Sequence, residues 1–129
     1  MASRRHLRNE DALIQLLDAW RFERVTLEKM TVAEQAQLFQ SAAIVVAPHG
    51  AGLTNLVFCE PHTKVLEIIH PWAINLMFWT IASHRGLDYY YIFAKGNLAG
   101  IDPKVCLNSD DMEVDLEALK LILEKMRLT

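Results

Sequence analysis

The chain has 129 residues, a length typical of one domain, and 52% of them are hydrophobic, which is enough to form a buried core. Its net charge of −3 argues against duplex nucleic acid as the main partner, because that partner requires a positively charged surface. No apolar run approaches the roughly 18 residues that cross a bilayer, and we expect no secretory signal after Met1 because the first residues lack an apolar stretch. The two cysteines have neither metal-ligand spacing nor the density of a disulfide framework.

Two elements are predicted ahead of the first apolar run. Asn9 is a candidate cap for a helix from about Glu10 to Trp20, whose leucines recur at helical spacing along one face. The segment from Arg24 to Glu28 then alternates apolar and polar residues. This alternation predicts a short strand.

The middle of the chain begins with a helix start signal. Thr31 and Glu34 have the spacing of a capping box, in which each side chain bonds the backbone of the other residue. The box predicts a helix that ends near Ala42. The apolar run from Ile44 to Ala47 is typical of a buried parallel strand, and the segment from Gly52 to Phe58 resembles the first turns of a helix.

The second half of the sequence continues the alternation of strands and helices. The predicted elements are a buried strand from Lys64 to Ile69, a helix carrying Ile74, Met77, Phe78, Ile81 and Ala82 and ended by Gly86, a strand from Asp88 to Phe93, a loop from Ala94 to Asp111 and a helix capped by Asp115.

Strands separated by helical patterns indicate βαβ units and a parallel sheet. We therefore predict an α/β fold: a Rossmann-like, three-layer α/β/α domain with a mostly parallel sheet of about four strands. It would span residues 1–129 as a single domain. Because the chain begins with a charged segment and no core strand, we expect it to be part of a longer protein.

The turn after the first apolar strand is the main candidate site, and it consists of His49, Gly50, Ala51 and Gly52. In a parallel α/β sheet, ligands bind beyond the carboxyl ends of the strands. Glycines let the backbone approach a ligand, and a following helix offers free N–H groups to a phosphate. The alternative is a purely structural turn. Thr54 and Asn55, on the next turn, could orient a ligand or cap the turn.

Glu67 is the second candidate, because it interrupts an apolar strand. A buried carboxylate is costly unless it is paired or hydrogen-bonded. One hypothesis is that Glu67 accepts bonds from ribose hydroxyls, as an acidic residue does in dinucleotide folds. The other is an internal pair, for example with an arginine or with backbone N–H groups.

Basic residues cluster near the start of the chain, at Arg4, Arg5 and Arg8. The guanidinium fork matches phosphate oxygens, which suits a diphosphate, but a solvated basic tail is the alternative. The other histidines form no recognisable metal set, and they are His6, His62, His70 and His84.

At this point the residues resemble a known family. The segments "SRR…RNE", "VTLEKMTVAEQAQLFQSAAIVVAPHGAGLTNLVFCEP" and "KVLEI" are similar to the glycosyltransferase family 61 domain. The resemblance runs from about Ser3 to Phe93, and "PHGAGLTNLVF" with the upstream "EQ…LF…A" is its most specific part.

The resemblance implies a nucleotide-sugar-dependent, inverting and metal-independent glycosyltransferase built from two Rossmann-like halves, as in the GT-B architecture. This chain resembles the C-terminal, donor-binding half, and a UDP-sugar is a typical donor. Arg4, Arg5 and Arg8 would contact the diphosphate, and the turn from His49 to Gly52 would cradle it. Glu67 would be a ribose or structural carboxylate. No cofactor is expected beside the donor.

The missing N-terminal half would carry the acceptor contacts and the catalytic base, so we expect the isolated chain to be inactive. Its partners would be the nucleotide sugar, a carbohydrate or protein acceptor, and either the missing half or a second copy. A bacterial cytoplasmic location is expected, with the secretory-pathway lumen as the alternative for a eukaryote. Two other functions stay open: a non-catalytic nucleotide-binding or assembly module, and a nicotinamide-dependent enzyme, against which the incomplete glycine fingerprint argues.

Overall fold

A computed structural model describes residues 9–70, 76–96 and 112–128. The α-helices are α1 (Glu10–Ala19), α2 (Val32–Ser41), α3 (Met77–Arg85) and α5 (Leu116–Leu128). Two 3-10 helices are η1 (Leu27–Lys29) and η2 (Ala51–Phe58). The strands are β1 (Ile44–Pro48), β2 (Lys64–Ile69), β3 (Asp88–Phe93), β4 (Lys95–Gly96) and β5 (Met112–Glu113).

The chain divides into two compact units, and each is described by itself. One unit contains α1, α5, β4 and β5, and the other contains η1, α2, η2, α3 and nearly all of the sheet formed by β1, β2 and β3. The prediction of a single domain over residues 1–129 stays a prediction.

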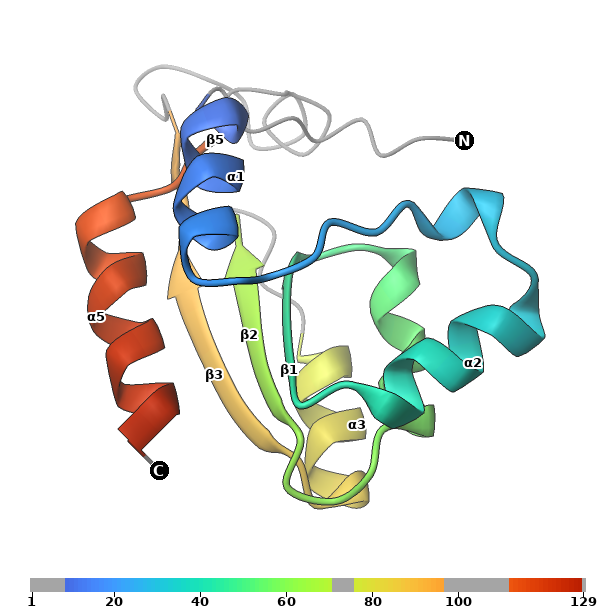
Figure 1. Cartoon of the computed structure of the whole chain (residues 1–129). Coiled ribbons are helices and arrows are strands. Elements are labelled where there is room, and N and C mark those ends of the chain that lie inside the picture. Colours follow the sequence, from blue (N-terminus) through green and yellow to red (C-terminus); the bar gives the residue numbers. More distant parts are fainter. Residues whose placement is uncertain (1–8, 71–75, 97–111, 129) are drawn as a thin grey trace. The chain divides into compact units, whose positions relative to one another are not determined.

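The main sheet has three strands in the order β1-β2-β3. β1 pairs with β2 in parallel, with Ala47 opposite Glu67 and Pro48 opposite Ile68. Figure 1 shows β2 and β3 side by side, with their arrowheads at the same end. The predicted α/β fold with a parallel, Rossmann-like sheet is therefore confirmed.

The strand predicted from Arg24 to Glu28 is wrong, and the segment ends in the 3-10 turn η1. Its alternating pattern does not reflect a buried face, because Val25 is 38% exposed. The carbonyl groups of Leu27 and Met30 accept bonds from the Gln35 side chain, at 2.9 and 3.2 Å. A side chain on α2 thus supplies hydrogen bonds that a neighbouring strand would otherwise have provided.

Most of the helix starts and ends predicted from the sequence are confirmed. In the capping box, the Glu34 N–H donates to Thr31 Oγ1 at 3.1 Å and the Thr31 N–H donates to Glu34 Oε1 at 2.9 Å. Gly86 ends α3 in the left-handed conformation, with φ of 69°. Asp115 Oδ1 accepts the first free N–H groups of α5, while the start predicted at Ile74 lies outside the described residues.

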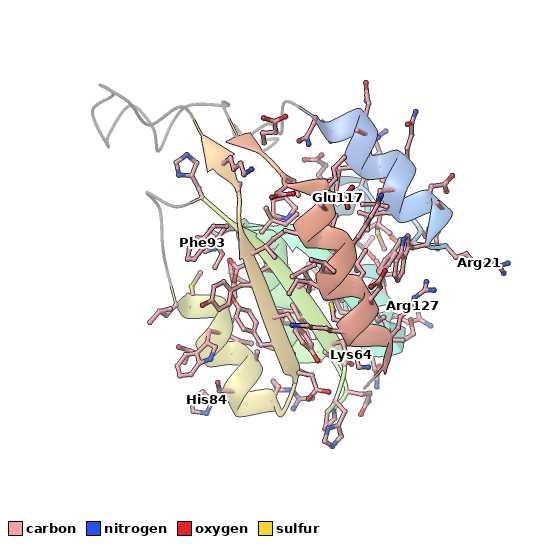
Figure 2. All side chains as sticks on the ribbon, turned by 90° about the vertical axis from the view of Figure 1, so that its left-hand side faces the viewer. Arg21, Lys64, His84, Phe93, Glu117 and Arg127 are labelled. Atoms are coloured by element: carbon pink, nitrogen blue, oxygen red, sulfur yellow. The ribbon has the colours of Figure 1, made fainter. Side chains whose placement is uncertain are left out.

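Asn9 does not cap α1 through its side chain. Its amide instead bonds both backbone groups of Val114: Asn9 Nδ2 donates to the carbonyl at 2.7 Å, and the Val114 N–H donates to Asn9 Oδ1 at 3.0 Å. The predicted cap is wrong because this distant backbone competes for the same side chain. At the other end of α1, Arg127 of α5, which Figure 2 labels, stacks over the Trp20 ring, with its Cζ atom 4.3 Å from the ring centroid.

The segment predicted to begin an α-helix, Gly52 to Phe58, is part of the 3-10 helix η2. The buried apolar residues of this segment are Leu53 and Leu56 of η2 and its C-cap Cys59, spaced by three. Residues three apart lie on one side of a 3-10 helix, which has three residues per turn. This spacing buries one side of η2, whereas an α-helix would rotate Cys59 away from the core.

In the unit that contains the sheet, one hydrophobic cluster packs α2, η2 and α3 against one face of that sheet. It joins Phe39 of α2, Leu53 and Leu56 of η2, Val65 of β2, and Phe78 and Ala82 of α3, with Val45, Ala47 and Tyr89 packed against it. Because alternate strand residues share a face, Glu67 lies on the same face of β2 as Val65. The helices therefore cover a sheet face that contains a carboxylate.

Candidate functional site

The turn from His49 to Gly52 lies directly after β1, at the carboxyl end of the strand. The backbone N–H of His49 donates to the carbonyl of Ile68 on β2, at 3.0 Å. This bond extends the pairing between the two strands one residue beyond Pro48 and fixes where the turn begins. The turn thus occupies the edge of the sheet where parallel α/β folds bind ligands.

Glu67 connects three neighbouring segments of the sheet. Its Oε2 bonds His49 Nδ1 at the end of β1, and its Oε1 accepts a hydrogen bond from the hydroxyl group of Tyr89 on β3. Glu67 is fully buried. Both carboxylate oxygens therefore have a protein partner, as a buried charge requires.

This arrangement matches the internal-pair alternative for Glu67, with different partners from those proposed from the sequence. His49 and Tyr89 take the places of the arginine and the backbone N–H groups. The described residues leave no part of Glu67 exposed to a ligand, since its relative exposure is 0%. The role of a ribose contact receives no support from this burial.

The His49 ring is held on two sides. Its Nδ1 faces the carboxylate, and its ring lies 4.7 Å from the Phe78 ring, with 51° between the planes. The His49 side chain is 13% exposed. Since a carboxylate can only accept, Nδ1 carries the proton of this bond, and Nε2 is the nitrogen left to act on anything outside the protein.

Tyr89 is the donor in its bond to Glu67. Burial raises the pKa of the Tyr89 hydroxyl far above its usual range, and the hydrogen bond to Glu67 and the charge of that carboxylate raise it further. The hydroxyl group therefore keeps its proton at every physiological pH. Sequence reasoning missed Tyr89, although the buried Glu67 was a signal to look for donors on the neighbouring strands.

The two glycines of the turn have different surroundings. A Cβ atom on Gly50 would lie 3.9 Å from the Pro48 carbonyl oxygen, an ordinary contact, whereas a Cβ atom on Gly52 would lie 2.7 Å from Leu27 Cδ1. Gly52 therefore allows η1 to pack closely against the turn. That role belongs to packing and does not require a ligand.

Asn55 connects the turn to α2 through the hydrogen bonds of its side-chain amide. It is buried, and its Nδ2 donates to Gln35 Oε1 at 2.8 Å and to the Gly52 carbonyl at 3.0 Å. Because Gln35 also binds the backbone of η1, one amide network ties α2 and η1 to the turn. The hydrogen bonds of Asn55 are thus internal to the protein, while Thr54 is exposed beside it.

The other predicted site residues cannot be placed. Arg4, Arg5 and Arg8 lie outside the described residues. Within the described ranges, no group of three His, Cys, Asp or Glu side chains could hold a metal ion. Nor is any helix there long and apolar enough to cross a membrane.

The sequence was compared with known proteins. The profile of the family described as Glycosyltransferase 61 matches residues 1–66. A beta-1,2-xylosyltransferase of Oryza sativa subsp. japonica, RCN11, is 40% identical over 72 residues, which cover 56% of this chain and 14% of that protein. The beta-1,2-xylosyltransferase of Arabidopsis thaliana is 36% identical over 64 residues, covering 50% of this chain and 12% of that protein.

A third relative is the xylan glycosyltransferase MUCI21 of Arabidopsis thaliana, 28% identical over 91 residues, which cover 66% of this chain and 18% of that protein. The chain thus spans less than a fifth of the length of each of these relatives. All three are plant proteins, so they give no support to the bacterial cytoplasm expected from the sequence. Because the family profile covers half of the chain, from the basic segment through β1, η2 and the first half of β2, the chain belongs to the glycosyltransferase 61 family.

Proposed function

We propose that the full-length protein is a glycosyltransferase that uses a nucleotide-sugar donor, and that this chain is its donor-binding half. Membership of the family and relatives named for sugar transfer support the reaction class. The donor role is supported above all by His49, which lies on the turn after β1 and whose side chain is held by the buried Glu67 carboxylate of β2. The turn lies at the ligand-binding edge of a parallel sheet.

The proposed reaction is a single displacement that inverts the anomeric carbon. A base removes the proton of the acceptor hydroxyl group, the new glycosidic bond forms, and the nucleotide diphosphate leaves with the electron pair of the broken bond. The developing negative charge requires fixed donors. His49, the N–H groups of the turn from Gly50 to Gly52, and the arginines at positions 4, 5 and 8 would supply them without a metal.

The relatives guide the choice of donor. Two of them are named for xylosyl transfer. The rice protein XAT3 is named for arabinosyl transfer, and it is 33% identical over 69 residues, which cover 50% of this chain and 12% of that protein. We therefore propose a nucleotide pentose such as UDP-xylose as the first donor to test. The acceptor would be a carbohydrate or a protein, and the plant relatives favour the secretory-pathway lumen as the location.

The remainder of the active site is proposed to lie in the other half of the full-length protein. Acceptor contacts and the base would come from there, so the isolated chain should bind UDP weakly and transfer no sugar. Sugar transfer by the isolated chain would contradict this division of labour.

Calorimetric titration of the chain with UDP, GDP and NAD tests the donor site. Binding of UDP is expected, and preferential binding of NAD would overturn the transferase proposal in favour of a nicotinamide enzyme. UDP binding combined with no sugar transfer by the full-length protein would favour a non-catalytic module.

The arginine contacts require the full-length protein. Arg8→Ala should weaken donor binding or lower turnover strongly, whereas Arg21→Ala, at an exposed arginine after α1 (Figure 2), should change neither. Unchanged turnover and donor affinity in Arg8→Ala would remove that residue from the site.

A further inference from the structure

We infer that Glu67 and Tyr89 are positioning residues for His49, and that His49 binds the donor diphosphate as an imidazolium, taking up one proton at Nε2 when the donor binds. This inference rests on the proposed function, because it concerns the same donor site. It adds a proton to the binding reaction and gives Tyr89 a role in it.

The first step concerns orientation. Glu67 Oε2 engages Nδ1 of the His49 ring, and the Phe78 ring lies against it. The Glu67 carboxylate cannot swing away without losing its second bond, from Tyr89. With Nδ1 engaged by the carboxylate, Nε2 is the ring nitrogen left to bind a ligand at the turn. A hydrogen bond to one ring nitrogen determines the role of the other.

The second step concerns charge. Among the described residues, the groups beside the His49 ring are the Glu67 carboxylate from β2, the Tyr89 hydroxyl group behind it from β3, and the uncharged Phe78 from α3. The first turn of η2 contains no acidic residue, and no basic residue lies in its last turn. Within the described residues, the basic side chain beside Glu67 is that of His49, and the two form an ion pair only when the ring is protonated.

These groups make the two protonation states of the ring differ in their affinity for a diphosphate. With a neutral ring, the Glu67 carboxylate is held by hydrogen bonds alone and the site presents a lone pair at Nε2, so a phosphate oxygen meets a net negative charge and no donor on the ring. With a protonated ring, the pair is neutral overall and presents an N–H donor. A ligand shifts an equilibrium toward the state that it binds better, so diphosphate binding should draw a proton to Nε2.

Donor binding transfers one proton and breaks no covalent bond of the donor. One proton passes from the buffer to the Nε2 lone pair, an N–H···O hydrogen bond forms to a phosphate oxygen, and no covalent bond of the donor breaks. Tyr89 keeps its own proton throughout, since burial and the neighbouring carboxylate raise its pKa. The proton returns to the buffer when the nucleotide diphosphate leaves.

Proton uptake can be counted by calorimetry with UDP on the 129-residue chain. Titrations near pH 8 are run in Tris and in HEPES, whose ionisation enthalpies differ. The difference in observed binding enthalpy gives the number of protons taken up. The expected result for the unaltered chain is close to one proton per UDP.

Variants assign this proton. Glu67→Gln keeps the shape and a hydrogen-bond acceptor but removes the charge, so proton uptake should fall toward zero and the Kd for UDP should rise about tenfold or more. His49→Gln should also abolish the uptake. Tyr89→Phe should keep the uptake while raising the Kd severalfold. The matched control is His84→Gln, at an exposed histidine of α3 (Figure 2), which should leave both quantities unchanged.

A second measurement needs neither a ligand nor an active enzyme. In the proton NMR spectrum of the unliganded chain, the Nδ1 proton of His49 should resonate at low field, as in strong carboxylate–imidazole hydrogen bonds. It should move upfield in Glu67→Gln, shift in Tyr89→Phe and stay in place in His84→Gln. A signal that is insensitive to Glu67→Gln would overturn the positioning role.

The outcomes separate the two proposals. UDP binding with no proton uptake, or with the same uptake in Glu67→Gln, overturns this inference and leaves the proposed donor site standing. A failure of UDP to bind at all overturns the proposed donor site and the proton uptake together, and the NMR signal then still decides whether Glu67 positions the ring.

Discussion

Tyr89→Phe removes one hydroxyl group from the interior of the sheet and should destabilise the protein measurably. The change leaves Oε1 of the fully buried Glu67 without its donor. A hydrogen bond to a charged group contributes about 1.5–3 kcal/mol to stability. Because the phenyl ring keeps the packing of the tyrosine, we expect a loss of about 2 kcal/mol in the free energy of unfolding.

The assay is equilibrium unfolding in urea. Small proteins lose roughly 1–3 kcal/mol of stability per molar urea, so the midpoint should fall by about 1 M with an unchanged slope. A double-mutant cycle with Glu67→Gln isolates the interaction. In the Glu67→Gln background the lost bond is between neutral groups, so the cost of Tyr89→Phe should drop to about 1 kcal/mol.

Two results would refute this reasoning. A cost below about 0.5 kcal/mol for Tyr89→Phe, the range of ordinary surface changes, would mean that the bond does not stabilise the fold. An equal cost in both backgrounds would mean that the hydroxyl group acts through something other than the charge of Glu67.

Three further changes test the surrounding scaffold. Thr31→Ala removes the capping box of α2 and should lower the free energy of unfolding, measured with urea, by about 1 kcal/mol. Thr31→Ser should lower it little, because the hydroxyl group is kept. Equal losses in the two variants would show that the Thr31 hydroxyl group does not cap the helix. Gly52→Ala places a Cβ atom against Leu27 and should lower the thermal midpoint by an amount equivalent to about 1 kcal/mol, with Gly50→Ala as the uncrowded control. Burial raises the pKa of the Cys59 thiol from 9.0 to about 11 in the folded protein, and urea unfolding at a series of pH values tests this shift. Its contribution to stability is therefore complete below pH 9 and is lost as the pH rises toward 11, by about 2 kcal/mol. Cys59→Ala should flatten this loss, and an unaltered slope would assign it to another group.

Local signals in the sequence determined most of the helices. The capping box at Thr31, the left-handed Gly86 and the Asp115 cap each depend on groups a few residues apart, which the chain brings together wherever it folds. The apolar runs of β1 and β2 likewise predicted buried parallel strands, because residues covered on both faces of a sheet must be apolar almost without interruption. Both strands are parallel, but only β2 is buried, whereas β1 at the end of the three-stranded sheet is half-buried.

The predictions from the sequence were wrong where a group distant in the chain formed hydrogen bonds with the same atoms. Asn9 bonds Val114 rather than its own helix, and Gln35 supplies the bonds that a strand would have given Leu27. The three-residue spacing of Leu53, Leu56 and Cys59 was visible in the sequence and fits a 3-10 helix. An apolar segment this short is ambiguous between helix types until a core is present to bury one side of it.

The sequence by itself singled out His49 and Glu67, one beside two glycines and the other as a charge inside an apolar strand. It could not show that these two residues, 18 positions apart in the chain, touch each other, because their contact depends on the parallel register of β1 and β2. Tyr89 joined them only through the order of the sheet, which places β3 beside β2. A carboxylate in an apolar strand indicates from the sequence that it needs partners, whereas tertiary structure decides which side chains reach it.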